Sequence, residues 1–374
     1  MSTNPRIYLD FNATAPLVPA AREAMVEALA VAGNPSSIHA HGRAARDLVE
    51  KARDKLARFA GRPREQVVFT SGGTEANALG VLGLAEIVER RGGPRVVAAS
   101  RVDHPSLRGA VAVLIRRGWE QRPRRLEALE GVGLVTASAV NHELGTTVDI
   151  AALSAAARSA GALLHVDAVQ AAGKIPLRTL PCDALVISAH KIGGPQGVGA
   201  LVISADDGLP LIEAGHQERE RRPGTENTLG IVGFGAAAAA VDLELWPHVA
   251  ALGDYFEQSL LAQHPGATIH GASSPRIGGT INAGFDGATG EAVAIALDLH
   301  GVSVSTGAAC TSGSTQPSPV LLALGLTREQ ALRAVRFSLG RPTTVEQIDV
   351  VLGLLPGILE RARGSTVRRA QHQE

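Results

Sequence analysis

The sequence predicts an α/β protein: a large domain with a mainly parallel β-sheet covered by helices, plus a smaller α+β domain. Three observations indicate this fold. The chain has 374 residues, and single domains stop growing near about 250–300. Hydrophobic residues make up 45% of the chain and charged residues 19%, which is enough apolar material for a large core. Short apolar runs alternate with helical patterns from about residue 60 to 230, which is typical of a parallel sheet.

Six apolar runs in this region are the expected strands, with helices between most of them. The strands are Val67–Thr70, Arg95–Ala99, Leu134–Ala139, Leu163–Val166, Ala184–Ser188 and Gly199–Ile203. The clearest helical patterns are Glu75–Arg91 and Ile150–Ser159. Parallel strands covered by helices are buried on both faces, which explains why these runs are almost continuously apolar.

The pattern changes beyond Leu245, where a long helical region is followed by shorter elements. We expect a strand at Thr280–Phe285, a helix near Glu291–Leu299 and a strand near Ala334–Leu339. The large domain is therefore predicted to span residues 15–250 and the small domain residues 251–374. We expect the N-terminal segment 1–14 to pack near the small domain.

Composition and charge disfavour several classes of protein. Lys plus Arg and Asp plus Glu both total 36, so neither a nucleic-acid coat nor a polybasic membrane binder is expected. The sequence contains no run of about 18 apolar residues, so no membrane span is expected, and the N-terminus does not resemble a signal peptide. Two cysteines cannot build a disulfide framework or, alone, a structural zinc site. We therefore expect a cytoplasmic protein that binds neither nucleic acid nor membrane.

Lys191 is one of only four lysines among 36 basic residues, and it lies just after the fifth expected strand. A lysine can lose its proton and act as a nucleophile, which arginine cannot do. The alternative is a surface lysine, the usual position of this residue type. The apolar run before Lys191 favours a position beside the core, where a lowered pKa promotes Schiff-base formation.

Other polar groups follow the expected strands, at the sheet edge where ligands of such proteins bind. The segment Thr70–Asn77 is either an anion cradle at a helix N-terminus or a tight turn with a cap. His104 either stacks on a flat ligand or is solvated, and Asn141 is in a place where amides often cap a helix. Asp167 is either a helix cap or a buried carboxylate that needs a partner, such as a protonated pyridine nitrogen. With Lys191, these groups supply what pyridoxal 5'-phosphate needs.

Seven motifs, in order along nearly the whole chain, carry a family resemblance. They are Tyr8–Pro16, Gly33–His39, Thr70–Asn77, His165–Gln170, Ser188–Lys191, Arg222–Asn227 and Arg336–Arg341. Through them the chain resembles the cysteine desulfurases, which belong to the class V branch of the fold-type I pyridoxal-phosphate enzymes. The resemblance implies a fold-type I transferase that removes sulfur from L-cysteine, with pyridoxal 5'-phosphate as cofactor.

The resemblance also implies a role for each matching residue. Lys191 matches the Schiff-base lysine, Asp167 the partner of the pyridine nitrogen, and His104 the residue that stacks on the ring and relays protons. The other cofactor contacts that it implies are Gly73, Thr74, Asn141, Gln170, Ser188, His190 and Thr225. Thr225 matches a residue that reaches the phosphate of the neighbouring subunit, which implies a homodimer with shared active sites. Arg336 matches the clamp for the substrate carboxylate, and Asn12 and Asn141 are also assigned to the substrate.

Cys310 distinguishes desulfuration from other class V reactions. It lies among Gly, Ala, Ser and Thr residues, which predicts an accessible loop, although an inert thiol is the alternative. By resemblance, Cys310 attacks the substrate sulfur and becomes a persulfide, which passes to an acceptor such as an iron–sulfur scaffold. We expect no resident metal, only a transient iron–sulfur contact at Cys310. Cys182 precedes a core strand, and we predict a structural role for it.

The chain departs from the family pattern at three positions. Ala189 occupies a usual glycine position, where a methyl group should be tolerated, and His142 replaces a common asparagine. His216 also replaces a glycine, and we expect a strained turn there if that position needs positive φ.

Two other functions remain open. One is another class V enzyme, such as a selenocysteine lyase, an aminotransferase or a kynureninase-like lyase. Transamination does not require a thiol like that of Cys310. The other is a non-catalytic sulfur-relay scaffold, which would be expected to have lost Lys191, Asp167 or Cys310, yet all three are present.

Overall fold

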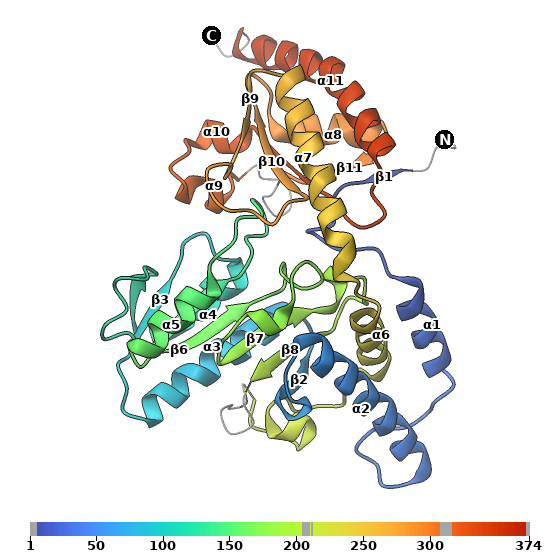
Figure 1. The fold of residues 1–374 in the computed structure, drawn as a ribbon, viewed down its shortest axis with the longest axis vertical. Coiled ribbons are helices and arrows are strands. Elements are labelled where there is room, and N and C mark those ends of the chain that lie inside the picture. Colours follow the sequence, from blue (N-terminus) through green and yellow to red (C-terminus); the bar gives the residue numbers. More distant parts are fainter. Residues whose placement is uncertain (1–5, 204–209, 211, 307–315, 372–374) are drawn as a thin grey trace. The chain divides into compact units, whose positions relative to one another are not determined.

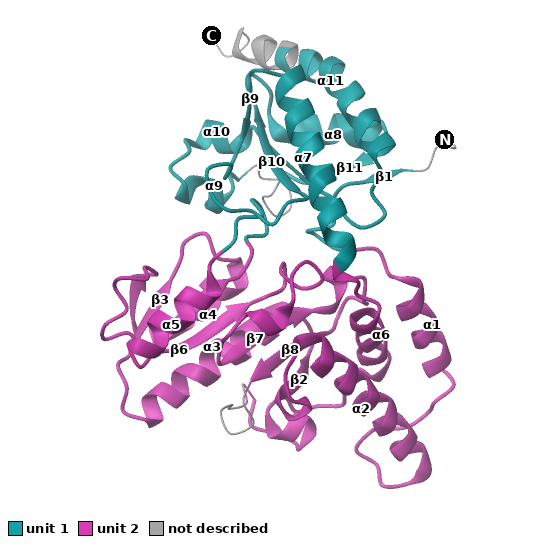
Figure 2. Cartoon of the chain, viewed as in Figure 1, with its two compact units in different colours: residues 1–14, 141–147, 244–374 teal, residues 15–140, 148–243 magenta. Residues whose placement is uncertain are grey.

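The computed structural model describes residues 6–203, 210, 212–306 and 316–371, with side chains described as far as residue 363. The chain divides into two compact units (Figure 2). Unit 1 comprises residues 1–14, 141–147 and 244–374, and unit 2 comprises residues 15–140 and 148–243. Compared with the predicted domains, residues 141–147 and 244–250 belong to the smaller unit.

A seven-stranded sheet forms the centre of unit 2 in the described part of the chain. Its order is β2 (Val67–Thr70), β8 (Gly199–Ile203), β7 (Ala184–Ser188), β6 (Leu163–Asp167), β5 (Leu134–Ser138), β3 (Val96–Ala99) and β4 (Glu120–Pro123). Strands β4, β3, β5, β6 and β7 pair in parallel, whereas β8 is antiparallel to both β7 and β2. The predicted α/β architecture with a mainly parallel sheet is confirmed, and all six expected strands are present within one residue at each end.

Helices of unit 2 begin where the sequence offers caps or turns. Helix α5 (Ile150–Ser159) begins after Asp149, whose carboxylate accepts from the Ala152 N–H at 2.9 Å. Helix α3 (Gly73–Arg90) begins after a turn at Ser71 and Gly72 that follows the end of β2. The remaining helices are α1 (Pro19–Ala28), α2 (Ala40–Ala60), α4 (Pro105–Arg116) and α6 (Thr228–Ala239).

Helix α6 is apolar on all sides because it packs against both α1 and α2, and Figure 1 shows α2 and α6 side by side. Gly235 permits this close packing, since a Cβ atom there would lie 2.7 Å from the Ala52 Cα atom. No single helix in the described ranges is long and apolar enough to span a membrane, although one bent pair of helices, α6 with the segment Leu243–Gln263, passes by length and composition.

Unit 1 contains an antiparallel sheet with β10 (Thr280–Phe285) between β12 (Ala334–Ser338) and β9 (Ala267–Ile269). A short parallel pair joins β1 (Ile7–Tyr8) to β11 (Val302–Ser303). The helices are α7 (Trp246–Gln263), α8 (Gly290–Leu299), α9 (Pro319–Ala323), α10 (Arg328–Leu332) and α11 (Val345–Gln371). The core includes Phe256 and Phe337, whose ring centroids are 5.0 Å apart in an edge-to-face contact. The predicted α+β elements β10, α8 and β12 are all present.

Candidate active site

The strand directions of unit 2 bring several candidate residues to one edge of the sheet. Since β8 is antiparallel to both β2 and β7, these two strands point the same way as β6. Strand β6 ends at Asp167 and β7 ends at Ser188, which is followed by Lys191 in the 3-10 turn Ala189–Lys191. Strand β2 ends just before Gly73. The carboxyl edge of the sheet therefore gathers groups from three strands, as ligand sites in such folds do.

Ser188 and Gly73 form a cradle that fits a phosphate group. A Cβ atom on Gly73 would lie 3.0 Å from Val169 Cγ2 and 3.5 Å from Ser188 Cβ, so the bare backbone lies directly against Ser188. The Ser188 hydroxyl is buried and has no hydrogen-bond partner among the described residues, where buried polar groups normally have one. No side chain among these residues caps α3, which leaves N–H groups of its first turn available, and Thr74 is exposed there. An anion at a helix N-terminus would satisfy these donors.

His190 and Lys191 follow Ser188 of this cradle by two and three positions in the sequence, and both are half-buried. Burial, and then the positive charge of Lys191, lower the pKa of His190 to about 4. His190 is therefore neutral near pH 7 and can donate one hydrogen bond without adding charge. A neutral donor next to the lysine suits a site where the amine must lose a proton.

Asp167 is buried, with 5% of its surface exposed, and both carboxylate oxygens accept hydrogen bonds. Oδ1 accepts from the Val169 N–H at 2.9 Å, and Oδ2 accepts from Asn77 Nδ2 at 2.9 Å. A buried carboxylate held in this way suits a cationic partner such as a protonated ring nitrogen. Gln170, three residues later, is also buried, and its Oε1 accepts from Lys174 Nζ at 3.2 Å.

His104 begins helix α4 as its cap. Its Nδ1 accepts from the Ser106 N–H at 3.2 Å and lies 2.7 Å from the Ser106 hydroxyl oxygen. The imidazole of His104 is thus held through Nδ1, so the proton of a neutral ring is on Nε2.

The predicted substrate residues gather in unit 1 around the backbone of the segment 141–147. Arg336, on β12, donates from Nη1 to the His142 carbonyl oxygen at 3.0 Å and from Nη2 to Asp10 Oδ1 at 2.7 Å. Asn12 Nδ2 donates to the same carbonyl at 3.2 Å. The side-chain oxygen of Asn141 accepts from the Glu143 N–H at 2.9 Å. Because His142 contributes its carbonyl oxygen to these contacts, the replacement of an asparagine side chain leaves them intact.

The guanidinium of Arg336 has an open hydrogen-bonding position. It is buried, with 5% exposed, and its Nε has no hydrogen-bond partner among the described residues. A planar donor group with one vacant N–H suits a carboxylate. The sequence did not indicate that Asp10 would also bind this arginine.

Of the two cysteines, the structure describes only Cys182. Cys310 lies outside the described residues, so the structure does not test its assignment. Cys182 is half-buried; burial, and then the nearby Asp183 carboxylate, raise its pKa to about 11, while Arg62 partly opposes the shift. A thiol with so high a pKa is a poor nucleophile near pH 7, which agrees with the structural role predicted for Cys182.

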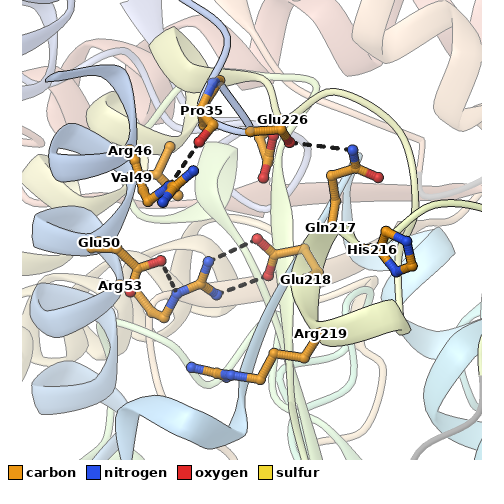
Figure 3. Close-up of a pocket in the computed structure, with 11 residues that line it drawn as sticks. Pro35, Arg46, Val49, Glu50, Arg53, His216, Gln217, Glu218, Arg219 and Glu226 are labelled. Carbon is orange, nitrogen blue, oxygen red and sulfur yellow. Dashed lines mark hydrogen bonds and ion pairs between the residues drawn. The ribbon is translucent and has the colours of Figure 1, made fainter. Parts of the chain in front are cut away.

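The expected strain at His216 is absent, because its φ is −116°. Positive φ occurs instead two to four residues later, at Glu218, Arg219 and Glu220, with φ of 47°, 57° and 67°. They are the only non-glycine residues with positive φ in the described part of the chain. Such backbone needs external support, and Glu218 supplies it through a buried ion pair with Arg53 (Figure 3). Thr225, in the same region, is exposed.

Comparison with known proteins places these observations in a family. The aminotransferase class-V family model matches residues 7–351. A protein of a Nostoc species named "Cysteine desulfurase" is 40% identical over 96% of this chain and 94% of its own length. A solved "NifS-like protein" is 31% identical, with a TM-score of 0.84 over 95% of this chain and 98% of the other. The structure described as "SspA in complex with cysteine" is 26% identical, with a TM-score of 0.76 over 90% of this chain and 100% of the other.

The family match includes residues of both units and all seven motifs named from the sequence. The fold-type I architecture and the predicted relationship to cysteine desulfurases are thereby confirmed. The chain belongs to the aminotransferase class-V family.

Proposed function

We propose that this protein is a cysteine desulfurase, which converts L-cysteine to L-alanine and keeps the sulfur as a persulfide on Cys310. The observation that carries the proposal is the relative named cysteine desulfurase, matched over 96% of the chain. Lys191, Asp167 and Cys310, which the reaction requires, are all present. A related structure described as a complex with cysteine favours the same substrate.

The residues at the sheet edge of unit 2 fit pyridoxal 5'-phosphate, which we propose as the cofactor. When bound, it supplies an electron sink for the charge that develops at the α-carbon of an amino acid. Ser188, Gly73 and Thr74 would hold its phosphate with His190, Asp167 would pair with its ring nitrogen, and Lys191 would bond to its aldehyde carbon. The unpartnered Ser188 hydroxyl is the feature of this chain that most directly supports a phosphate site.

Residues of the chain then have separate tasks. Arg336 binds the substrate carboxylate through its vacant N–H, with Asn12 and Asn141 nearby in unit 1. Lys191 moves the proton of the α-carbon. The Cys310 thiolate attacks the substrate sulfur: an S–S bond forms, the C–S bond breaks, and the carbon keeps that electron pair and takes a proton to give alanine.

The wider assembly is also a proposal. Exposed Thr225 would reach the phosphate bound by a second copy of the chain, which makes the active unit a homodimer. The persulfide passes to a sulfur acceptor, for which an iron–sulfur scaffold is the expected class. A cytoplasmic location agrees with the low cysteine content.

The experiment is reconstitution with pyridoxal phosphate followed by an assay for alanine from L-cysteine under a reductant. A visible absorbance band of lysine-bound cofactor and alanine formation in the wild type, lost in Cys310→Ala and kept in Cys182→Ala, would support the proposal. A protein that binds cofactor but forms no alanine would contradict desulfuration and favour another class V reaction. A protein that binds no cofactor would contradict the enzyme assignment and favour a scaffold.

A further inference from the structure

Asn77, on α3, joins Asp167 of the proposed site to two residues behind it in unit 2 through its side-chain amide. Nδ2 donates to Asp167 Oδ2 and to Ser106 Oγ, both at 2.9 Å. Oδ1 lies 2.9 Å from Nε2 of His165. Asn77 is 1% exposed and His165 is 0% exposed, so water does not compete for these bonds.

The orientation of the Asn77 amide follows from its neighbours. An ionised carboxylate can only accept hydrogen bonds, so the group facing Asp167 must be the NH2 of Asn77. The opposite orientation would set an amide oxygen against a carboxylate oxygen in a buried site, which is strongly unfavourable. The amide oxygen therefore faces His165, and Nε2 of His165 must carry a proton to donate to it.

His165 is suited to hold this single orientation. Complete burial lowers its pKa to about 3, so the ring is neutral and has one proton, which Nε2 must carry. Nδ1 is then unprotonated, and it has no hydrogen-bond partner among the described residues. Gly80 makes room for the ring, since a Cβ atom there would lie 2.6 Å from His165 Cε1. An uncharged side chain with no second hydrogen-bond partner among the described residues has one evident task, which is to hold Asn77.

The second branch of the chain of hydrogen bonds reaches His104. A backbone N–H can only donate, so Nδ1 of His104, which accepts from the Ser106 N–H, carries no proton. The Ser106 hydroxyl donates to the same Nδ1 and accepts from Asn77 Nδ2. The proton of a neutral His104 is consequently on Nε2.

We propose that Asn77, itself held by His165, is a positioning residue that sets the Asp167 carboxylate and orients the Ser106 hydroxyl, which in turn holds His104, for the bound cofactor. This inference rests on the proposed function, and assigns residues that the sequence motifs contain without giving them a role. One amide thereby couples the partner of the ring nitrogen to the residue expected to stack on the ring.

Three variants and one control test the inference. Asn77→Leu removes the whole connection, and His165→Phe removes only the donor that holds Asn77. His165→Gln is the conservative variant, because its amide nitrogen reaches about the position of imidazole Nε2. Thr136→Val is the matched control: Thr136 pairs with His165 across β5 and β6, is fully buried, and its hydroxyl has no hydrogen-bond partner in the part of the chain that the structure describes.

Two measurements do not depend on turnover. Histidine ¹⁵N NMR of the cofactor-free protein reports the tautomers of His104 and His165, and we expect Nε2–H in both. The dissociation constant of pyridoxal phosphate, and the ¹⁵N signal of its ring nitrogen when labelled, report the state of Asp167. We expect Asn77→Leu to weaken binding about 10-fold to 100-fold and to change the ring-nitrogen signal. His165→Phe should move both measurements the same way, His165→Gln should restore them, and Thr136→Val should leave them unchanged.

The outcomes separate this inference from the function itself. If the wild type binds no cofactor, the proposed function fails and this inference fails with it. If the wild type binds cofactor and Asn77→Leu gives the same affinity and ring signal, the inference is overturned while the function stands. If Asn77→Leu does not fold, the pair His165→Phe and His165→Gln decides, since equal values in these two would overturn the inference.

Discussion

Replacement of Glu218 by alanine should destabilise unit 2 strongly, because this side chain is the main partner of a buried guanidinium. Arg53 donates to Glu218 Oε2 at 2.8 Å from Nη1 and to Oε1 at 2.7 Å from Nη2. The Arg53 side chain is 5% exposed and that of Glu218 is 2% exposed. Although burial opposes it, hydrogen bonding to Glu218 raises the pKa of Arg53, which stays charged.

The magnitude follows from the groups left behind. Removing one partner of a buried ion pair costs about 3–5 kcal/mol, because the other charge stays buried. Arg53 would retain the Val67 carbonyl oxygen at 2.8 Å and Glu50 at 3.1 Å. The N–H of Phe69, which donates to Glu218 Oε2 at 2.8 Å, would lose its partner at a cost of about 1–3 kcal/mol. A neighbouring cavity of about 320 Å³ admits water, so we expect a total near the lower end of this sum, about 4–5 kcal/mol.

The assay is urea unfolding of matched variants, followed by circular dichroism. Asp47→Ala is the control, because the Asp47–Lys51 ion pair is exposed and is worth about 0–1 kcal/mol. The double variant Arg53→Met with Glu218→Ala should be more stable than Glu218→Ala alone, since it removes the uncompensated charge.

Two results would refute the reasoning. One is a Glu218→Ala protein as stable as Asp47→Ala, which would mean that the pair contributes nothing measurable. The other is a double variant no more stable than the single one, which would place the cost in the backbone of residues 218–220 rather than in the buried charge.

Three further predictions concern the site. Ser188→Ala should weaken pyridoxal-phosphate binding about 10-fold to 100-fold, as loss of a hydrogen bond to a charged group does, with Thr136→Val unchanged; equal dissociation constants would refute the phosphate assignment. Arg336→Lys should raise KM for L-cysteine more than it lowers kcat and leave cofactor binding unchanged, since lysine lacks the Nε–H that is vacant in this arginine. An unchanged KM would exclude the carboxylate role. Burial lowers the pKa of His165 to about 3 from an unfolded value of 6.5, so the unfolded chain takes up the proton first as pH falls. The stability that His165 contributes is full above pH 6.5 and is lost progressively as the pH falls below it. The urea midpoint of the wild type should therefore fall between pH 6.5 and about 5 more steeply than that of His165→Gln. Parallel curves for the two proteins would contradict this prediction.

The strands of unit 2 could be predicted because a parallel sheet covered on both faces requires continuous apolar runs. Strand β4 is the exception, since its sequence Glu-Gln-Arg-Pro is polar and mostly exposed at the edge of the sheet. Nothing apolar marks such a strand, and only its parallel pairing with β3 defines it.

Side-chain contacts between distant residues could not be predicted. The segment 141–147 belongs to unit 1 because of bonds such as Ser318 Oγ to Glu143 Oε2 at 2.5 Å, across 175 positions of the chain. Asn77 and His165 lie within motifs quoted from the sequence, but their contact spans 88 positions. The motifs therefore identified the strand-end residues that face a ligand, while the residues that hold them in place required the structure.

The central claim is that Cys310 receives the sulfur of L-cysteine, and mass spectrometry of the Cys310 peptide tests it most directly. Wild-type protein loaded with pyridoxal phosphate would be treated briefly with L-cysteine, without reductant, and then digested. The account predicts a Cys310 peptide one sulfur atom heavier, formed together with alanine, and no such addition at Cys182. Alanine formation without sulfur on Cys310, or undiminished alanine formation by Cys310→Ala, would contradict it.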